Sequence, residues 1–222
     1  MPTSPPSPAP TQPLPPAVLL HRYSFNDGTA SDSVGGSAFA GTLMNGATVT
    51  NNQATLWQWG AYVNLPSGLF GNYTAVSIEA WVSTSWGWNS PRLFQYGSDG
   101  TSNANSIAVH NDYQSYGTAL DWFDSSGISN KYVSDTWFFY QTNAHVVVSL
   151  TEGGAGTLYI NGQKKGSTPG AVNPFPQPDV FYIGKSFGND PGFTGSVNEF
   201  RIWGGILKDS DVATGYAYGP GE

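Results

Sequence analysis

The sequence has no cysteine and few charged residues. None of its 222 residues is cysteine, and only 10% are charged. The lack of cysteine excludes disulfide bonds and thiolate metal sites, although it does not decide the cellular compartment. Because so few charges are present, we expect serine, threonine, asparagine and the backbone to supply most of the polar groups that contact water at the surface.

Basic residues and long apolar runs are also scarce. Eight lysines and arginines stand against 15 acidic residues, which gives a net charge of −7 and an isoelectric point near 4.7. This balance argues against nucleic acid or an anionic membrane as a partner. No apolar run reaches about 18 residues, so the sequence predicts no membrane-spanning helix.

Proline is concentrated at the start of the chain, where eight of the 16 prolines fall within residues 1–16. Proline fixes φ and lacks an N–H donor, so this segment is predicted to be an extended, disordered linker. It is similar in composition to the proline-rich linkers of plant and algal wall glycoproteins, and a proline-rich peptide ligand is the alternative. No secretion signal follows Met1. A cytosolic start is one explanation, but the linker fits a fragment of a longer secreted protein better. The folded domain is expected to span residues 17–219.

Residues 17–219 are rich in glycine, hydroxyl side chains and aromatics, which favours strands and tight turns. Strands are expected at 18–25, 39–49, 55–65, 76–83, 92–96, 106–110, 118–123, 129–133, 138–150, 157–160, 180–184 and 193–203. Segment 76–83 carries bulk on both faces, so we expect it in the middle of a sheet. Ser210 is expected to cap a short C-terminal helix. Many short strands at near-regular spacing indicate an antiparallel β-sandwich.

Segment 157–166 predicts a β-hairpin. Asn161 and Gly162 tolerate the positive φ angles that a type I′ turn requires at both central residues. Leu158 and Ile160 share one face of the incoming strand. With the two strands that follow it, this hairpin resembles the last third of laminin G-like domains of the concanavalin A-like jelly-roll group.

Earlier segments extend this resemblance, in the family's order, over nearly all of residues 18–218. They are 21–28, 32–41, 60–66, 77–82 and 144–149. The resemblance implies an all-β fold, an antiparallel β-sandwich of the concanavalin A-like jelly-roll type. Two positions depart from the family pattern. Asn198 stands where aspartate is usual, and Ala144 precedes His145 where tryptophan is usual.

The resemblance also implies a structural calcium ion. Asn26, Asp27 and Asp32 lie close together around the first turn, and Asn198 and Glu199 would come from a neighbouring strand. Calcium takes about six to eight oxygen ligands. Asp27 and Asp32 are the implied ligands, and Asn198 would complete the site with less charge. The alternative is that Asp27 forms a plain turn and Asp32 caps a loop.

Aromatic residues in the predicted loops form the candidate carbohydrate- or partner-binding site. Flat rings stack on the apolar faces of sugars, while nearby amides and carboxylates bind hydroxyl groups. Two loops combine such groups: they contain Trp86, Trp88 and Asn89, and Asp112, Tyr113 and Tyr116. Trp57 and Trp59 would share a face if their segment is extended. Burial is the alternative for each of these tryptophans, and Trp81, Trp122, Trp137 and Trp203 are expected in the core.

The acidic residues and histidines argue against an enzyme. The chain has four glutamates, and none lies in the Glu-x-Asp-x-x-Glu strand typical of concanavalin-like hydrolases. Asp121 and Asp124 are three residues apart and would face opposite sides of a strand. The three histidines lack zinc spacing, and no serine lies in a nucleophile elbow. His145, within an apolar run, is expected to be a core residue.

We therefore expect a non-catalytic recognition module, extracellular or on a cell surface. It would act in lectin-like binding or adhesion, recognising a glycan or an extracellular or cell-wall protein through rim loops. A purely structural subunit of a larger assembly is the alternative, and a glycoside hydrolase is the third reading. Asn72 begins the sequence Asn72-Tyr73-Thr74 and is a candidate glycosylation site.

Overall fold

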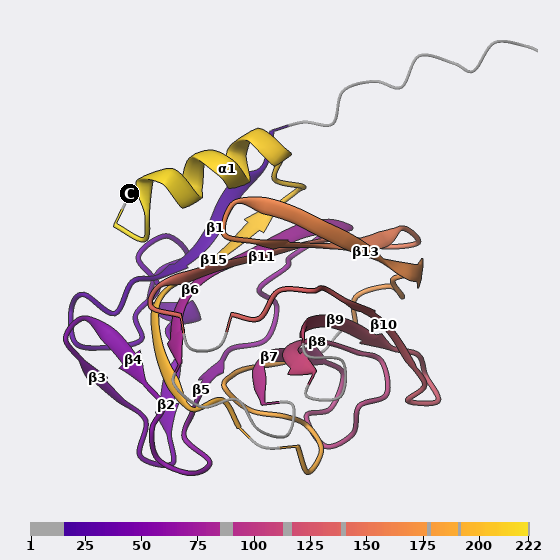
Figure 1. The fold of residues 1–222 in the computed structure, drawn as a ribbon. Coiled ribbons are helices and arrows are strands. Elements are labelled where there is room, and N and C mark those ends of the chain that lie inside the picture. The colour runs from indigo at the N-terminus through magenta and orange to yellow at the C-terminus, as the bar shows by residue number, and fades with distance from the viewer. Residues whose placement is uncertain are drawn as a thin grey trace, which may run out of the picture.

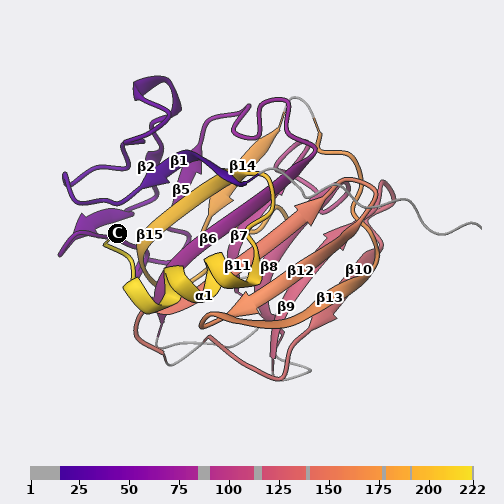
Figure 2. The same cartoon turned by 90° about the horizontal axis from the view of Figure 1, so that it is seen from above.

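The structure is a computed structural model that describes residues 16–84, 91–112, 117–138, 141–176, 179–190 and 192–221. Two antiparallel sheets pack face to face, and one helix lies across the outer face of the first sheet (Figures 1 and 2). Aliphatic and aromatic side chains fill the space between the sheets. The expected antiparallel β-sandwich of the concanavalin A-like type is therefore confirmed.

Sheet A contains eight strands. In sheet order they are β13 (Gln163–Ala171), β12 (Ala155–Ile160), β11 (Ala144–Thr151), β6 (Ala75–Thr84), β15 (Gly195–Gly204), β4 (Gln53–Thr55) and β3 (Thr48–Thr50), while β1 (Val18–Tyr23) also pairs with β15. Sheet B contains seven strands. They are β10 (Ser129–Val133), β9 (Gly117–Phe123), β8 (Ser106–Asp112), β7 (Arg92–Gly97), β14 (Val180–Ile183), β5 (Tyr62–Leu65) and β2 (Thr42–Met44).

Two helices complete the secondary structure: the short 3-10 helix η1 (Ser37–Phe39) and the helix α1 (Asp209–Tyr218). Val212 of α1 packs with Val147, Tyr159 and Leu207 on the outside of sheet A. Within the described ranges, neither helix has the length and apolar character needed to cross a membrane.

β6 lies in the middle of sheet A, as its sequence predicts, because it pairs with β11 on one side and β15 on the other. Its even-numbered residues, such as Ile78 and Val82, belong to the core between the sheets. Its odd-numbered residues face α1: Glu79 and Trp81 are both buried. Large side chains occur on both faces of this strand because other parts of the protein bury both faces.

Aromatic rings join the two sheets across the core. Phe94 of sheet B meets Phe200 of sheet A edge-to-face, with ring centroids 5.9 Å apart. Phe181 contacts both rings, at 5.6 and 5.7 Å. Such pairs contribute about 0.5–1.5 kcal/mol each beyond the burial of their area. Aromatic rings from both sheets thus help to hold the sandwich together.

The predicted hairpin is confirmed. β12 and β13 flank Asn161 and Gly162, whose φ angles are 51° and 75°. Both angles lie in the left-handed region that a type I′ turn requires. A Cβ atom on Gly162 would come within 3.0 Å of the Tyr216 ring. This turn therefore also packs closely against α1.

Three local predictions are corrected. The strand expected at 138–150 begins only at Ala144, because Asn143 adopts a φ of 52° that interrupts an extended chain. The segment expected as a strand at 39–49 holds two strands, which a turn with positive φ at Asn45 separates. Ser210 does not cap α1. Lys208 occupies the N-cap, and the Asp211 carboxylate accepts its backbone N–H at 3.1 Å.

Candidate functional site

The most exposed tryptophan of the described chain lies in the loop between β4 and β5. The Ala61 N–H donates to the Gln58 carbonyl at 2.9 Å, which closes a turn with Trp59 at its second position. Gly60 follows with a φ of 78°, as the third residue of a type II turn requires. The Trp59 side chain is 85% exposed, and Trp57 is 51% exposed. The two residues therefore sit in and beside a turn, not on one face of an extended strand.

A pocket of about 240 Å³ opens beside Trp59, where three loops of the chain meet at one end of sheet B. The β2–β3 turn contributes Asn45, and the β4–β5 loop contributes Trp59 and Gly60. The loop after β14 contributes Gly184, Lys185, Ser186, Gly188, Asn189, Asp190 and Gly192. The Asn45 Nδ2 donates to the Gly60 carbonyl at 3.2 Å, so the first two loops are tied together.

Lys185 is held in this pocket by two tyrosine rings. Its Nζ atom lies 4.5 Å from the ring centroids of both Tyr62 and Tyr182. The two rings meet edge-to-face at 5.1 Å, and Phe187 packs against Tyr182 at 5.4 Å. A cation above an aromatic face is attracted by the ring quadrupole. The ammonium group is therefore positioned as a hydrogen-bond donor near the pocket.

Asp190 is the one carboxylate among the described residues that line the pocket. The Arg92 Nη2 atom donates to its Oδ2 at 2.6 Å. Arg92 is nearly inaccessible, with a side chain 5% exposed, whereas the Asp190 side chain is 38% exposed. Burial lowers the pKa of Arg92, and the charge of Asp190 opposes this shift. The buried arginine thus fixes a carboxylate that still faces solvent.

Behind this pair, the outer face of sheet B carries further buried charges. His110 Nε2 lies 3.6 Å from Asp121 Oδ2, and Lys131 forms an ion pair with Asp112. The Ser129 hydroxyl donates to Asp121 Oδ1 at 2.8 Å. Burial is the main cause that lowers the pKa of His110, so its imidazole is neutral at neutral pH. Ser129 and Lys131 thus hold Asp121 and Asp112 in the sheet, whereas His110 Nε2 has no hydrogen-bond partner among the described residues.

The predicted rim site is described only in part. Trp86, Trp88, Asn89, Tyr113 and Tyr116 lie outside the described residues. Asp112 is described, but it is buried at the end of β8 and pairs with Lys131. It therefore lies in the structural ion-pair cluster of sheet B. The predicted rim site, Asp112 included, stays a prediction.

The expected core tryptophans are buried to different degrees. Trp81 and Trp122 are 1% and 8% exposed, whereas Trp137 and Trp203 are half-buried and pack against the hydrophobic clusters. His145 is a core residue, as expected. It is 0% exposed, its Nε2 lies 2.9 Å from Glu79 Oε1, and its ring stacks on Trp81.

The residues implied as calcium ligands have protein partners. Asp32 Oδ1 accepts backbone N–H groups from Arg22, Val34 and Gly35, and its Oδ2 lies 2.5 Å from His21 Nδ1. Asp32 thus caps the loop after β1 and pairs with a buried histidine, which the sequence did not reveal.

The other two implied ligands form contacts of their own. Asp27 accepts hydrogen bonds from Ser31 and Thr29, which lower the pKa of its carboxyl. Asn198 Nδ2 approaches Asn143 Oδ1 at 3.5 Å. In the described part of the chain, no three histidine or acidic side chains gather closely enough to hold a metal ion. Calcium therefore stays a prediction.

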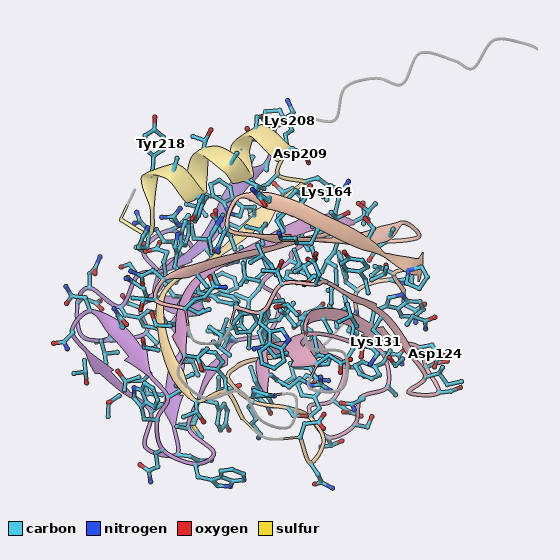
Figure 3. All side chains as sticks on the ribbon, viewed as in Figure 1. Asp124, Lys131, Lys164, Lys208, Asp209 and Tyr218 are labelled. Atoms are coloured by element: carbon cyan, nitrogen blue, oxygen red, sulfur yellow. The ribbon has the colours of Figure 1, made fainter. Side chains whose placement is uncertain are left out.

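Two other positions bear on the sequence predictions. Asn72 is exposed in the loop between β5 and β6, where a glycan would be accessible. Asp124 (labelled in Figure 3) lies in the tight turn between β9 and β10 and accepts the backbone N–H of Ser126 and of Ile128. Asp121 and Asp124 therefore serve separate structural roles.

Sequence reasoning missed the pocket residues Asn45, Lys185 and Asp190. The one available signal was the composition of 184–192, where glycine, asparagine, aspartate and proline supply six of the nine residues directly after a strand. Such a composition indicates a loop, and loops commonly carry binding residues. It does not reveal that this loop meets Trp59.

Comparisons with known proteins agree with the observed fold. The family described as the concanavalin A-like lectin/glucanases superfamily, Laminin_G_3, matches residues 58–213. No curated protein sequence matches the chain. Domain 4 of AbnA, a GH43 extracellular arabinanase from Geobacillus stearothermophilus solved in complex with arabinotriose, is 25% identical with a TM-score of 0.67. That match covers 90% of this chain and 98% of the domain.

More distant structures share the fold. Trypanosoma rangeli sialidase in complex with sialic acid is 19% identical with a TM-score of 0.68, and the match covers 89% of this chain but 32% of the sialidase. The binding domain of Paraclostridial Mosquitocidal Protein 1 is 13% identical with a TM-score of 0.67, over 90% of this chain and 52% of that one. The sandwich therefore also occurs as a part of larger proteins.

Proposed function

This chain belongs to the concanavalin A-like lectin/glucanases superfamily, and we propose that it is a non-catalytic extracellular module that binds glycans. One observation carries the proposal. The Trp59 indole is 85% exposed on a turn, directly beside a pocket lined by amide, ammonium and carboxylate groups. An indole presents a flat apolar face for a sugar ring, and the polar groups supply partners for its hydroxyls.

The exposure of Trp59 requires an explanation. Tryptophan is a large residue that is highly buried on average, as Trp81 and Trp122 are in this chain. The turn projects the Trp59 ring into solvent, and the Asn45 side chain holds the turn by its hydrogen bond to the Gly60 carbonyl. The position of Trp59 therefore follows from the conformation of the loop. The similar domain of the arabinanase, which was solved with arabinotriose, supports a saccharide as the occupant.

The charges near the pocket favour binding over catalysis. A retaining glycosidase requires two carboxyl groups about 5–5.5 Å apart across the scissile bond. Asp190 is the one carboxylate among the described pocket residues, and it is tied to Arg92. Asp121 and Asp112 are buried and paired with His110 and Lys131. We expect no release of reducing sugar from polysaccharides, and measurable turnover by the purified chain would contradict this part of the proposal.

A glycan array tests the proposal directly. The purified chain should bind a defined set of saccharides, and the bound set should be confirmed by isothermal titration calorimetry. If no saccharide binds above background, with or without calcium, the glycan-binding proposal fails. A structural or adhesion subunit with a protein partner would then be the better reading.

Calcium belongs to the proposal as a structural ion near Asp27 and Asp32. Because His21 lies 2.5 Å from Asp32 Oδ2, an ion that uses this oxygen must displace the imidazole. Melting in calcium and in EDTA tests the ion. A higher midpoint with calcium would support it, and equal midpoints would remove it.

A further inference from the structure

We infer that Asp190, anchored by Arg92, and the Trp59 ring together form a subsite for a neutral sugar residue that presents neighbouring hydroxyl groups. This inference rests on the proposed function, which concerns glycans in general, and it adds the residues and the charge class of the ligand. The inference is based on the positions of one carboxylate, Asp190, and one ammonium group, Lys185, in the pocket beside the exposed Trp59 ring.

Asp190 has the features of a hydroxyl acceptor. Its Oδ2 accepts one hydrogen bond from the buried Arg92, while its side chain stays 38% exposed at the pocket. Within the described ranges, no other hydrogen bond reaches this carboxylate. Hydrogen bonds to an ionised acceptor are about twice as strong as neutral ones. A fixed carboxylate with free lone pairs therefore suits two neighbouring sugar hydroxyls.

Arg92 acts through Asp190 as a positioning residue. Its side chain is only 5% exposed, so it is not placed to contact a ligand, and it reaches Asp190 from within the sheet. It lies over the Phe123 ring at 5.9 Å, and the negative charges of Asp121 and Asp112 also stabilise its charged form. The orientation of Asp190 is therefore set by the sheet before a ligand arrives. Such preorganisation reduces the ordering cost of binding.

The charge balance of the pocket favours a neutral ligand. Lys185 contributes one positive group, which the Tyr62 and Tyr182 rings hold in place, and Asp190 contributes one negative group. A sugar carboxylate at this subsite would meet Asp190 and a protein of net charge −7. A neutral sugar can accept from the ammonium and donate to the carboxylate without repulsion. Its apolar face can then lie on the Trp59 ring.

Two substitutions test the subsite. Trp59→Ala removes the stacking surface, and Asp190→Asn preserves the shape while it removes the charged acceptor. The matched control is Tyr218→Ala, which removes a ring that is 71% exposed on α1 and points into solvent away from the sandwich (Figure 3). Melting curves of Trp59→Ala and Tyr218→Ala should overlay that of the unmodified chain within about 2 °C, because both side chains contact solvent. Asp190→Asn should melt lower, because it leaves the buried Arg92 without its carboxylate, so its affinity is compared at a temperature at which it is still folded.

Binding should be measured by calorimetry with neutral trisaccharides, namely arabinotriose, xylotriose, cellotriose and galactotriose. Trigalacturonic acid is the acidic counterpart of galactotriose. We expect losses of at least about 30-fold for Trp59→Ala and about tenfold for Asp190→Asn, with no change for Tyr218→Ala. Affinity for a neutral trisaccharide should change little between about 50 and about 500 mM salt, because no ion pair forms.

The outcomes separate this inference from the proposed function. If the unmodified chain binds saccharides but Trp59→Ala and Asp190→Asn bind equally well, the subsite lies elsewhere while glycan binding stands. If the chain prefers trigalacturonic acid and Asp190→Asn tightens that binding, the neutral class is wrong. If no saccharide on the array binds the unmodified chain, the proposed function itself has failed.

Discussion

Replacing Gly60 by alanine should weaken both the fold and ligand binding, because Gly60 determines where Trp59 points. Gly60 has a φ of 78°, and the nearest atom to a Cβ built there is the Asn45 Nδ2 at 3.9 Å. Space is therefore available, and the cost is conformational. Left-handed backbone costs a residue with a Cβ atom about 1–2 kcal/mol. We expect Gly60→Ala to lower the free energy of unfolding by this amount, or to shift the turn.

Gly28 provides a matched control for this substitution. It has the same φ of 78°, with nothing within 4 Å of a built Cβ, and it lies in the turn after β1 rather than at the pocket. Gly28→Ala should therefore cost about as much stability, about 1–2 kcal/mol, without an effect on ligand affinity. Gly60→Asn should cost less than Gly60→Ala, because asparagine tolerates left-handed backbone.

Urea unfolding and calorimetric titration of the same samples provide the two measurements. For a domain of this size, about 1 kcal/mol corresponds to a shift of roughly 2–4 °C in the melting temperature. We expect both alanine variants to lose stability and only Gly60→Ala to lose affinity. If Gly60→Ala binds as tightly as Gly28→Ala, the turn does not position Trp59, and the reasoning that links this turn to recognition is refuted.

Three further predictions concern the fold. Phe200→Ala should lower the free energy of unfolding by about 3–5 kcal/mol in urea titrations, because the ring contacts Phe94 and Phe181 at the centre of the core; a cost below about 1 kcal/mol would contradict this packing. The pKa of His110 is lowered by burial, so the unfolded chain binds more protons below pH about 6.5, and stability should fall as pH decreases through that value. His110→Gln should flatten this dependence, and an unchanged slope would assign it to other groups. Glu79→Gln should destabilise the fold by about 3–5 kcal/mol because it removes the buried carboxylate that faces His145 and leaves Arg201 with Glu199 alone; equal urea midpoints would contradict this assignment.

Local patterns explain why much of the fold is predictable from the sequence. The alternation in 76–83 placed β6 in the middle of a sheet, and Asn161-Gly162 located the hairpin, because both signals depend on nearest neighbours. The errors arose where one backbone angle overrides a favourable composition. Asn143 breaks the 138–150 pattern with its φ of 52°, an angle that asparagine tolerates but does not require, so the residue type alone did not locate the break.

The candidate site was less predictable because it depends on contacts between distant residues. Arg92 and Asp190 are 98 positions apart, and nothing near either residue indicates the other. His21 and Asp32 are close in sequence, but whether Asp32 binds an ion or a histidine depends on the burial of both. Trp57 and Trp59 were recognised as possible ligand-binding rings. Their exposure follows from the turn at Gly60. The sequence prediction assumed an extended strand over 55–65 and therefore did not include this turn.

The same structure explains why recognition should reside in loops and not on a sheet face. The outer face of sheet A is covered by α1, and its Glu79 and His145 bind each other. On sheet B, Asp112 is buried and paired with Lys131, and Asp121 accepts from Ser129, so using either carboxylate for a ligand would first require breaking these contacts. A turn such as the one at Trp59 exposes a ring without removing one from the core. Loops around the pocket can therefore change ligand specificity at little cost in stability, whereas changes on either face would destabilise the sandwich.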